Sequence, residues 1–146
     1  MPEEEKIALV TGASSGFGLL IAVALAREGY RVVASMRDPE RCEPLLREAG
    51  KAGVAGRLDI AKLDVTDAAA IEAAVTGTVD KYGRIDALVN NAGFAVGGFI
   101  EEVPEEAWRA QMETNFFGLV AVTRAVLPFM RAQGNGAIIQ IGSVSG

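Results

Sequence analysis

Three glycines and two serines follow the first apolar run of the chain, in the stretch VTGASSGFG. Gly12, Gly16 and Gly18 have the spacing G-x-x-x-G-x-G, which lets a backbone turn sharply and approach a diphosphate without a Cβ in the way. A helix that begins here would attract anions through its unpaired N–H groups and its dipole, and Ser14 and Ser15 can add donors. The stretch predicts a phosphate cradle; the alternative is an ordinary glycine-containing turn between a strand and a helix.

A second group of small and polar residues, Asn90-Asn91-Ala92-Gly93, follows another apolar run. Two asparagine side chains beside a small Ala-Gly backbone would form a narrow wall that can contact a ribose or a planar ring. A plain Asn-Gly turn after a strand is the alternative.

Short β-branched runs alternate with longer segments of helical period, which indicates βαβ units. The pattern predicts strands over 7–10, 31–35, 56–63, 85–90 and 137–141 and helices over 17–28, 40–49, 67–82 and 104–131. Asp67 is the expected N-cap of the third helix. One buried face is expected on the third helix, formed by Ile71, Ala74, Val75, Val79 and Tyr82, and one on the fourth, formed by Met112, Phe116, Leu119, Thr123, Val126 and Met130.

Parallel strands joined by right-handed crossovers predict an α/β fold with a doubly wound parallel sheet of strand order 3-2-1-4-5 and helices on both faces. The order reverses between the first and fourth strands, and ligands bind at the carboxyl ends of strands beside such a point. We therefore expect the loops after Val10 and Asn90 to form one crevice.

The composition limits the classes of protein that remain. The length of 146 residues and a hydrophobic fraction of 50% fit one domain with a packed core. A net charge of -5 and a pI of about 4.8 argue against nucleic acid as a partner. The single cysteine, Cys42, excludes an internal disulfide, and the absence of histidine removes the commonest zinc ligand, so we expect no metal. The acidic N-terminus and the short apolar runs predict no membrane anchor and a cytoplasmic protein.

Five motifs, in this order, resemble the short-chain dehydrogenase/reductase family. They are Thr11-Gly12-Ala13-Ser14-Ser15-Gly16-Phe17-Gly18, Asp64-Val65 after the third strand, Asn90-Asn91-Ala92-Gly93, Asn115 in the fourth helix, and Ile141-Gly142-Ser143 after the fifth strand. The resemblance runs over essentially the whole chain. It implies a three-layer Rossmann-like dinucleotide-binding domain over residues 1–146, an oxidoreductase that moves a hydride between NADP(H) and an alcohol or carbonyl substrate, and a homo-oligomer.

The resemblance also implies which residues bind the cofactor. The first loop would hold the diphosphate, Asp64 would contact the adenine, and the second loop would lie along the nicotinamide side. The candidates are Gly12, Ser14, Ser15, Gly16, Phe17, Gly18, Arg37, Asp64, Val65, Asn91, Ala92 and Gly93. The alternative for Asp64 is a solvated turn residue before the third helix.

The end of the second strand should choose between NADP and NAD. Ser35 stands where NAD-preferring relatives place an acid, and Arg37 is close enough to pair with a 2′-phosphate, so NADP is favoured. Asp38 keeps NAD open, because a slip of one residue would bring a carboxylate to the same place. Arg37 could also be a solvated turn charge.

Ser143 matches the family's serine, which hydrogen-bonds the substrate oxygen, and Asn115 matches the asparagine that orders the proton path. From its place in the apolar stripe of the fourth helix, we expect the Asn115 amide to be buried and to need partners. Gly142 departs from the serine pair common in the family, and Ser145 is the alternative to Ser143.

The family's Tyr-x-x-x-Lys motif would fall about a dozen residues beyond Ser143, past the last residue, Gly146. Neither Tyr30 nor Tyr82 is followed by a lysine at that spacing. We therefore expect a truncated domain, incomplete at its C-terminus and inactive alone. Two other interpretations remain: a non-catalytic dinucleotide-binding module whose ligand alters its association with a partner, and a structural fragment that folds by pairing its fifth strand.

Overall fold

In the computed structural model, the described part of the chain, residues 4–144, contains one parallel sheet of five strands. The strands are β1 (Ile7–Val10), β2 (Arg31–Met36), β3 (Leu58–Lys62), β4 (Ala87–Asn90) and β5 (Ala137–Gln140). Their order is β3-β2-β1-β4-β5, which confirms the predicted order and the doubly wound α/β class. β1 therefore pairs with β2 on one side and with β4 on the other.

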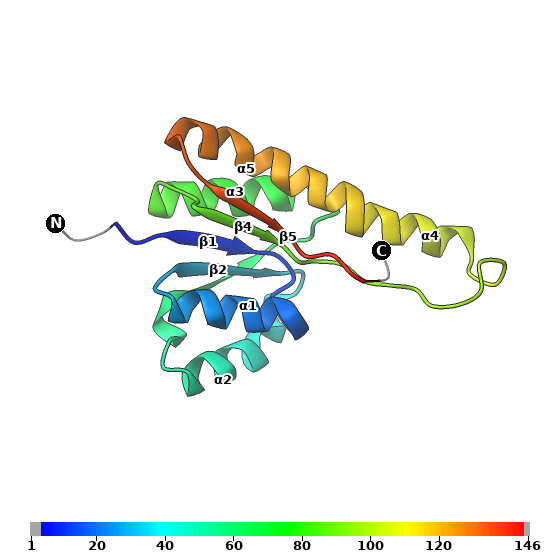
Figure 1. Ribbon diagram of the computed structural model, residues 1–146, viewed down its shortest axis with the longest axis horizontal. Coiled ribbons are helices and arrows are strands. Elements are labelled where there is room, and N and C mark those ends of the chain that lie inside the picture. Colours follow the sequence, from blue (N-terminus) through cyan, green and yellow to red (C-terminus); the bar gives the residue numbers. More distant parts are fainter. Residues whose placement is uncertain (1–3, 145–146) are drawn as a thin grey trace.

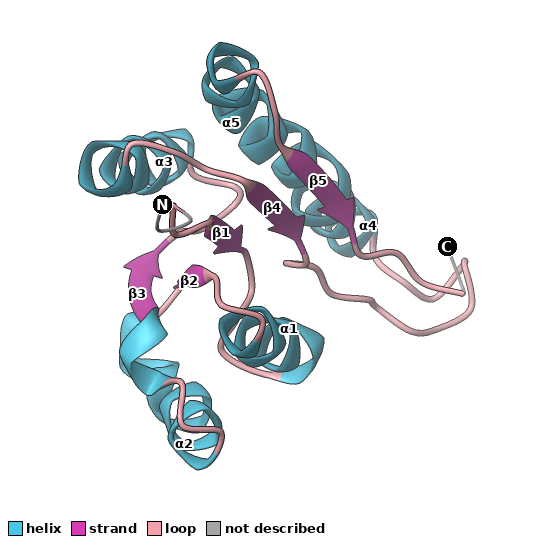
Figure 2. Ribbon diagram, turned by 60° about the vertical axis from the view of Figure 1, so that its left-hand side comes forward, coloured by secondary structure: helices cyan, strands magenta, loops and turns pink. Residues whose placement is uncertain are grey.

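Helices cover both faces of the sheet, as Figures 1 and 2 show. On one face lie α1 (Gly16–Arg27) and α2 (Glu43–Lys51), and on the other lie α3 (Ala68–Tyr82), α4 (Glu105–Met112) and α5 (Leu119–Gln133). Short 3-10 helices, η1 (Pro39–Cys42) and η2 (Ala55–Arg57), flank α2. A π-helical segment, η3 (Glu113–Gly118), joins α4 to α5 in one continuous rod.

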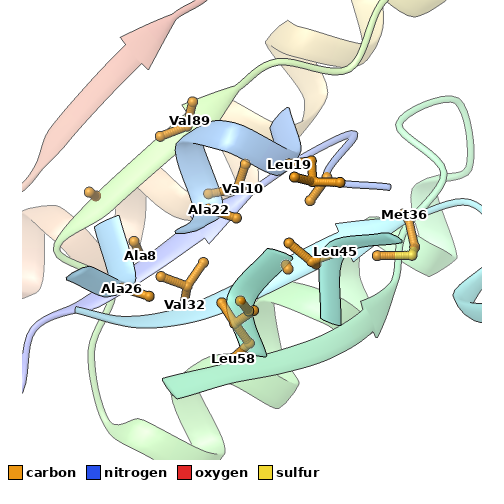
Figure 3. Close-up of a cluster of buried hydrophobic side chains, with 14 residues drawn as sticks. Ala8, Val10, Leu19, Ala22, Ala26, Val32, Met36, Leu45, Leu58 and Val89 are labelled. Carbon is orange, nitrogen blue, oxygen red and sulfur yellow. The ribbon is translucent and has the colours of Figure 1, made fainter. Parts of the chain in front are cut away.

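The sheet separates two cores because successive side chains of a strand point to opposite faces. Ala8 and Val10 of β1 face α1 and α2, whereas Ile7 and Leu9 face α3 and α5. Figure 3 shows the first core, in which Leu19, Ala22 and Ala26 of α1 and Leu45 of α2 pack on the sheet. Full burial of one such leucine contributes about 1.5–3 kcal/mol, so these layers hold the ends of the strands in fixed positions.

The third helix ends where the sequence predicts. Asp67 is its N-cap, and Asp67 Oδ1 accepts hydrogen bonds from the backbone N–H of Ala69 at 3.0 Å and of Ala70 at 3.2 Å. Gly83 ends it in the left-handed conformation, with φ of +77°. The predicted buried face is confirmed for Ile71, Ala74 and Val75.

The predicted strand 56–63 is shorter in the structure, because residues 55–57 form η2 and β3 begins at Leu58. The predicted helix over 104–131 is interrupted by η3, and its predicted buried face is wrong at two positions: Met112 and Phe116 are each 50% exposed. The line of most buried residues instead runs through Gly118, Val122, Val126 and Met130. A π turn holds more residues than an α turn, so a stripe drawn with one period slips out of phase across it.

Candidate functional site

The glycine loop after β1 is shaped by contacts that only glycine permits. Gly12 and Gly16 have φ of +65° and +56°, a conformation that other residues rarely adopt. A Cβ on Gly18 would overlap the carbonyl oxygen of Gly12 and Nδ2 of Asn91. A Cβ on Gly16, in contrast, would meet no atom within 4 Å. Gly18 therefore seats α1 against both loops, and Gly16 lies on the open side of the turn.

The N-terminus of α1 is open and free of negative charge in its first turn. Ser15 is its N-cap but makes no side-chain capping hydrogen bond, and the first turn contains no acidic residue. Ser15, Gly16 and Phe17 are exposed. A helix of 12 residues with uncapped first-turn N–H groups and an open glycine turn in front of it offers donors and a positive dipole to an anion.

The two predicted loops lie side by side and are joined by hydrogen bonds. Thr11 Oγ1 accepts from the backbone N–H of Asn91 and of Ala92, both at 3.0 Å. Asn91 Nδ2 donates to the carbonyl oxygens of Thr11 at 3.2 Å and Gly12 at 3.1 Å. The loops after Val10 and Asn90 are thus one connected unit at the point where the strand order reverses.

The predicted wall of two asparagine side chains is wrong for Asn90. Asn90 is 4% exposed, and its Nδ2 donates to Thr123 Oγ1 at 2.9 Å, so the side chain faces α5 rather than the glycine loop. Alternation along β4 explains this, because neighbouring residues point to opposite faces of the sheet. The surface beside the glycine loop is left to Asn91, Ala92 and Gly93.

The carboxyl end of β2 differs from the sequence-based expectation at Ser35. Ser35 is fully buried, and its Oγ donates to the carbonyl oxygen of Val10 at 2.9 Å, so the side chain at this position lies inside the sheet. Arg37 is the first exposed residue after β2. Asp38 caps η1, accepting from the backbone N–H of Glu40 at 3.0 Å. Arg37 and Asp38 are thus both exposed at the strand end, and one oxygen of Asp38 is used in capping η1.

Asp64 follows β3 on the same edge of the sheet. Its Oδ1 accepts from Thr66 Oγ1 at 2.7 Å and from the Thr66 N–H at 2.9 Å. The pKa of Asp64 is lowered from its ordinary value. The largest cause is the hydrogen bond from the Thr66 hydroxyl, followed by the Thr66 N–H and the charge of Arg37, whereas burial acts to raise this pKa. The charged form of Asp64 is therefore favoured, and Arg37 is near enough to act on it.

Val65 is 6% exposed and belongs to the core on the α3 and α5 side. Its side chain packs against Gly118, the last residue of η3. Gly118 was not among the sequence-predicted residues; a glycine inside an otherwise helical pattern is the signal that could have found it.

Asn115 is exposed, which contradicts the prediction of a buried amide, but both ends of the amide are paired. Nδ2 donates to the carbonyl oxygen of Phe94 at 2.7 Å, and Oδ1 accepts from the Phe94 N–H at 3.0 Å. A Cβ on Gly93 would lie 3.0 Å from Asn115 Oδ1. Asn115 therefore fixes the continuation of the second loop to η3.

Ser143 is exposed in the segment after β5. That segment is held beside the end of β4, since the N–H of Ile141 donates to the carbonyl oxygen of Asn90 at 3.0 Å. Ser145, the alternative, lies outside the described residues. Tyr30 precedes β2 and Tyr82 ends α3, both before the amino ends of strands, so neither shares the edge that carries Ser143.

Residues 4–144 contain neither a metal-binding cluster nor a membrane-spanning helix. No three His, Cys, Asp or Glu side chains are grouped so that they could hold a metal ion. No helix in this part of the chain has the length and hydropathy required to cross a membrane.

The arrangement is that of a dinucleotide-binding α/β protein, with a glycine turn and a helix N-terminus at the reversal of strand order. The family model for short chain dehydrogenases matches residues 6–146, and the chain belongs to the short-chain dehydrogenase/reductase family.

Three relatives illustrate the similarity. An oxidoreductase of Bacillus subtilis, YusZ, is 51% identical over 142 residues, which are 97% of this chain and 50% of that protein. The structure of a variant of actinorhodin polyketide ketoreductase with NADPH is 42% identical, with a TM-score of 0.89 over 97% of this chain and 54% of that one. A metagenomic short-chain oxidoreductase in complex with NADP is 37% identical, with a TM-score of 0.85 over 96% of this chain and 62% of that one.

The chain spans about half the length of the curated relatives that it matches. The fold and the family are shared over this half.

Proposed function

We propose that the protein binds NADP(H) at the carboxyl ends of β1 and β4 and transfers a hydride between it and an alcohol or carbonyl substrate. The main observation behind this proposal is that the N-terminus of α1 is uncapped and follows an open glycine turn. Hydrogen bonds between Thr11 and Asn91 join this turn to the second loop. The relatives that bind NADPH or NADP support the choice of cofactor.

In this proposal the diphosphate lies on the first turn of α1, held by N–H groups of Gly16, Phe17 and Gly18 and by Ser14 and Ser15. Asp64 and Val65 lie beside the adenine. The nicotinamide end lies along Asn91, Ala92 and Gly93. NADP(H) supplies or accepts the hydride when bound. The protein's own residues orient it, exclude water and provide the partner proton.

Arg37 is the residue that we propose to select NADP. Its guanidinium follows β2, with Ser35 buried and Asp38 committed to capping η1. A charge-assisted pair with the 2′-phosphate contributes about 1.5–3 kcal/mol, or roughly ten- to a hundredfold in affinity. In the complete protein, Arg37→Ala should weaken NADPH binding by that factor and leave NADH binding near the parent value.

Fluorescence titration with both cofactors measures this preference. Arg47→Ala removes an exposed arginine from α2 and serves as the control, since Arg47 pairs with Glu43 and Glu48 of its own helix. A parent protein that binds both cofactors equally would refute the role of Arg37, as would an Arg37→Ala variant that keeps the preference.

Ser143 is the residue that we propose to act in catalysis. Its hydroxyl would hydrogen-bond the substrate oxygen, where charge develops as the hydride moves, and Asn115 would keep the proton path in order. In the complete protein, Ser143→Ala should lower the turnover number by about a hundredfold or more while NADPH binding stays near the parent value. Normal turnover in Ser143→Ala, together with an inactive Ser145→Ala, would show that the serine motif is misplaced.

A non-catalytic dinucleotide-binding module is the second candidate, favoured by one observation: in residues 1–146 neither tyrosine lies four positions before a lysine. Turnover of the parent protein separates the two. Cofactor binding without turnover in the parent protein, over a panel of carbonyl compounds, supports the module.

We also propose that the protein forms a homo-oligomer through its α4 and η3 segments. Trp108, Met112 and Phe116 recur every four residues there and are 37%, 50% and 50% exposed. This apolar stripe, together with Phe117 at 54%, gives an apolar surface of the kind that marks an interface between proteins.

A further inference from the structure

Gly118 lies buried at the end of η3, in a position that has no room for a side chain. A Cβ built there would stand 2.6 Å from Cγ2, 2.9 Å from Cβ and 3.1 Å from the carbonyl oxygen of Val65. Two of these three atoms belong to a side chain and one to the backbone. Real Cβ atoms keep more than 3.4 Å from most neighbours, so any larger residue must push η3 and the loop after β3 apart.

Val65 cannot easily yield to such a push. It is 6% exposed and sits in the core with Leu63, Ile71 and Val75, which are themselves 1–4% exposed. Interiors of this kind are close-packed and transmit displacement rather than absorb it. The displacement would therefore fall on the helical segment that carries Gly118.

Asn115 is three residues before Gly118 in the same π-helical segment. Both of its hydrogen bonds, at 2.7 Å and 3.0 Å, go to the backbone of Phe94, immediately after Gly93. These bonds are lost if η3 moves away by about 1 Å, since hydrogen bonds weaken steeply beyond about 3.2 Å. The contact between Gly118 and Val65 thus sets how far the Asn115 amide reaches.

We infer that Gly118 is a positioning residue of the active site. By seating η3 against Val65, it aligns Asn115 with Phe94 and connects the loop after β3 to the loop after β4, on opposite sides of the cofactor crevice. The catalytic consequence rests on the proposed function, whereas the alignment itself is a property of the fold.

The experiment compares Gly118→Ala, Val65→Ala and the double variant in the complete protein. Gly118→Ala should increase the exchange rate of the Phe94 amide hydrogen, measured by NMR, by tenfold or more. It should lower kcat by about a hundredfold, the cost of a displacement near 1 Å, with the KM for NADPH within threefold of the parent because the glycine loop is untouched. Val65→Ala removes Cγ2, the closest atom, so the double variant should regain a measurable part of both losses.

Gly77→Ala is the matched control. Gly77 lies inside α3, and a Cβ there meets no atom within 4 Å, so this variant should leave Phe94 exchange and kcat at parent values. Thermal unfolding of every variant separates a global loss of stability from the local effect.

Three outcomes would overturn the inference: unchanged Phe94 exchange in Gly118→Ala, kcat and KM that change together in proportion to stability, or no recovery in the double variant. Failure of the proposed function is recognised separately, since a parent protein without NADPH-dependent turnover would still report the alignment through Phe94 exchange.

Discussion

Asp64 is the carboxylate of the candidate site whose pKa is most clearly shifted. The Thr66 hydroxyl, the Thr66 N–H and the Arg37 charge lower it, so the ionised form contributes stability at pH values above about 3.9, the ordinary value of an aspartate. This contribution is lost as the pH falls through the lowered pKa of the folded protein. Acid should therefore remove whatever stability the Asp64–Thr66 turn adds.

Thr66→Val tests this at a single residue. The variant loses the hydroxyl, the largest cause of the shift, and should raise the pKa of Asp64 toward its ordinary value, as followed by NMR of the carboxyl carbon. Thr66→Ser keeps the hydroxyl and should keep the low pKa. The stability difference between parent and Thr66→Val should vanish below the folded-state pKa; a constant difference at all pH values would contradict the assignment.

Single residues differ in how far their conformation could be predicted from the sequence. Gly12, Gly16 and Gly18 could be predicted because their spacing reflects a backbone requirement. The inward side chains of Ser35 and Asn90 could not, since the face to which a strand-end residue points depends on the register and exact end of the strand. A boundary uncertain by one residue reverses that direction.

The rod formed by α4, η3 and α5 is the element that departs most from expectation. The sequence predicts one buried apolar face, yet the structure exposes Met112 and Phe116 and buries Gly118 instead. Periodicity reveals a continuous helix but not a π turn inside it, because the extra residue depends on tertiary contacts such as the one with Val65. Apolarity alone does not distinguish a core face from an interface.

The exposed apolar stripe of this rod leads to a prediction about association. Met112→Glu places a charge in the middle of the stripe, and burying an unpaired charge is costly, so association should weaken by tenfold or more. Sedimentation velocity over a range of concentrations measures the change. Ala110→Glu adds the same charge at an exposed position of α4 outside the stripe and should associate like the parent. Equal association of parent and Met112→Glu would place the interface elsewhere.

At the scale of the whole molecule, the strand order and the two-layer covering of the sheet could be predicted because they follow from alternating periods and from the handedness of crossovers. The strand order alone was enough to predict that the loops after β1 and β4 lie side by side. The substrate could not be predicted in the same way, because substrate identity depends on the particular side chains around a pocket and not on the strand order.

Residues 1–146, prepared alone, should show no alcohol or carbonyl redox turnover even where they retain affinity for the dinucleotide. Loss of a proton-transferring group removes a factor of about a hundred to ten thousand. NADPH oxidation over a panel of carbonyl compounds measures this, with the complete protein as the positive control. Robust turnover by the short chain would mean that its own residues donate the proton.

The pairing of β1 also sets an order of events during synthesis. Ile7 pairs with Arg31 of β2, which emerges from the ribosome soon after it, whereas Ala8 pairs with Ala87 of β4, which emerges much later. If β1 and β2 pair before β4 arrives, the growing chain has an unpaired strand edge beside the glycine turn, and such edges can pair with the wrong strands. We therefore expect the nascent protein to pass through a stage in which the first loop is formed without the second, a stage that ends when Asn91 reaches Thr11 and Gly12.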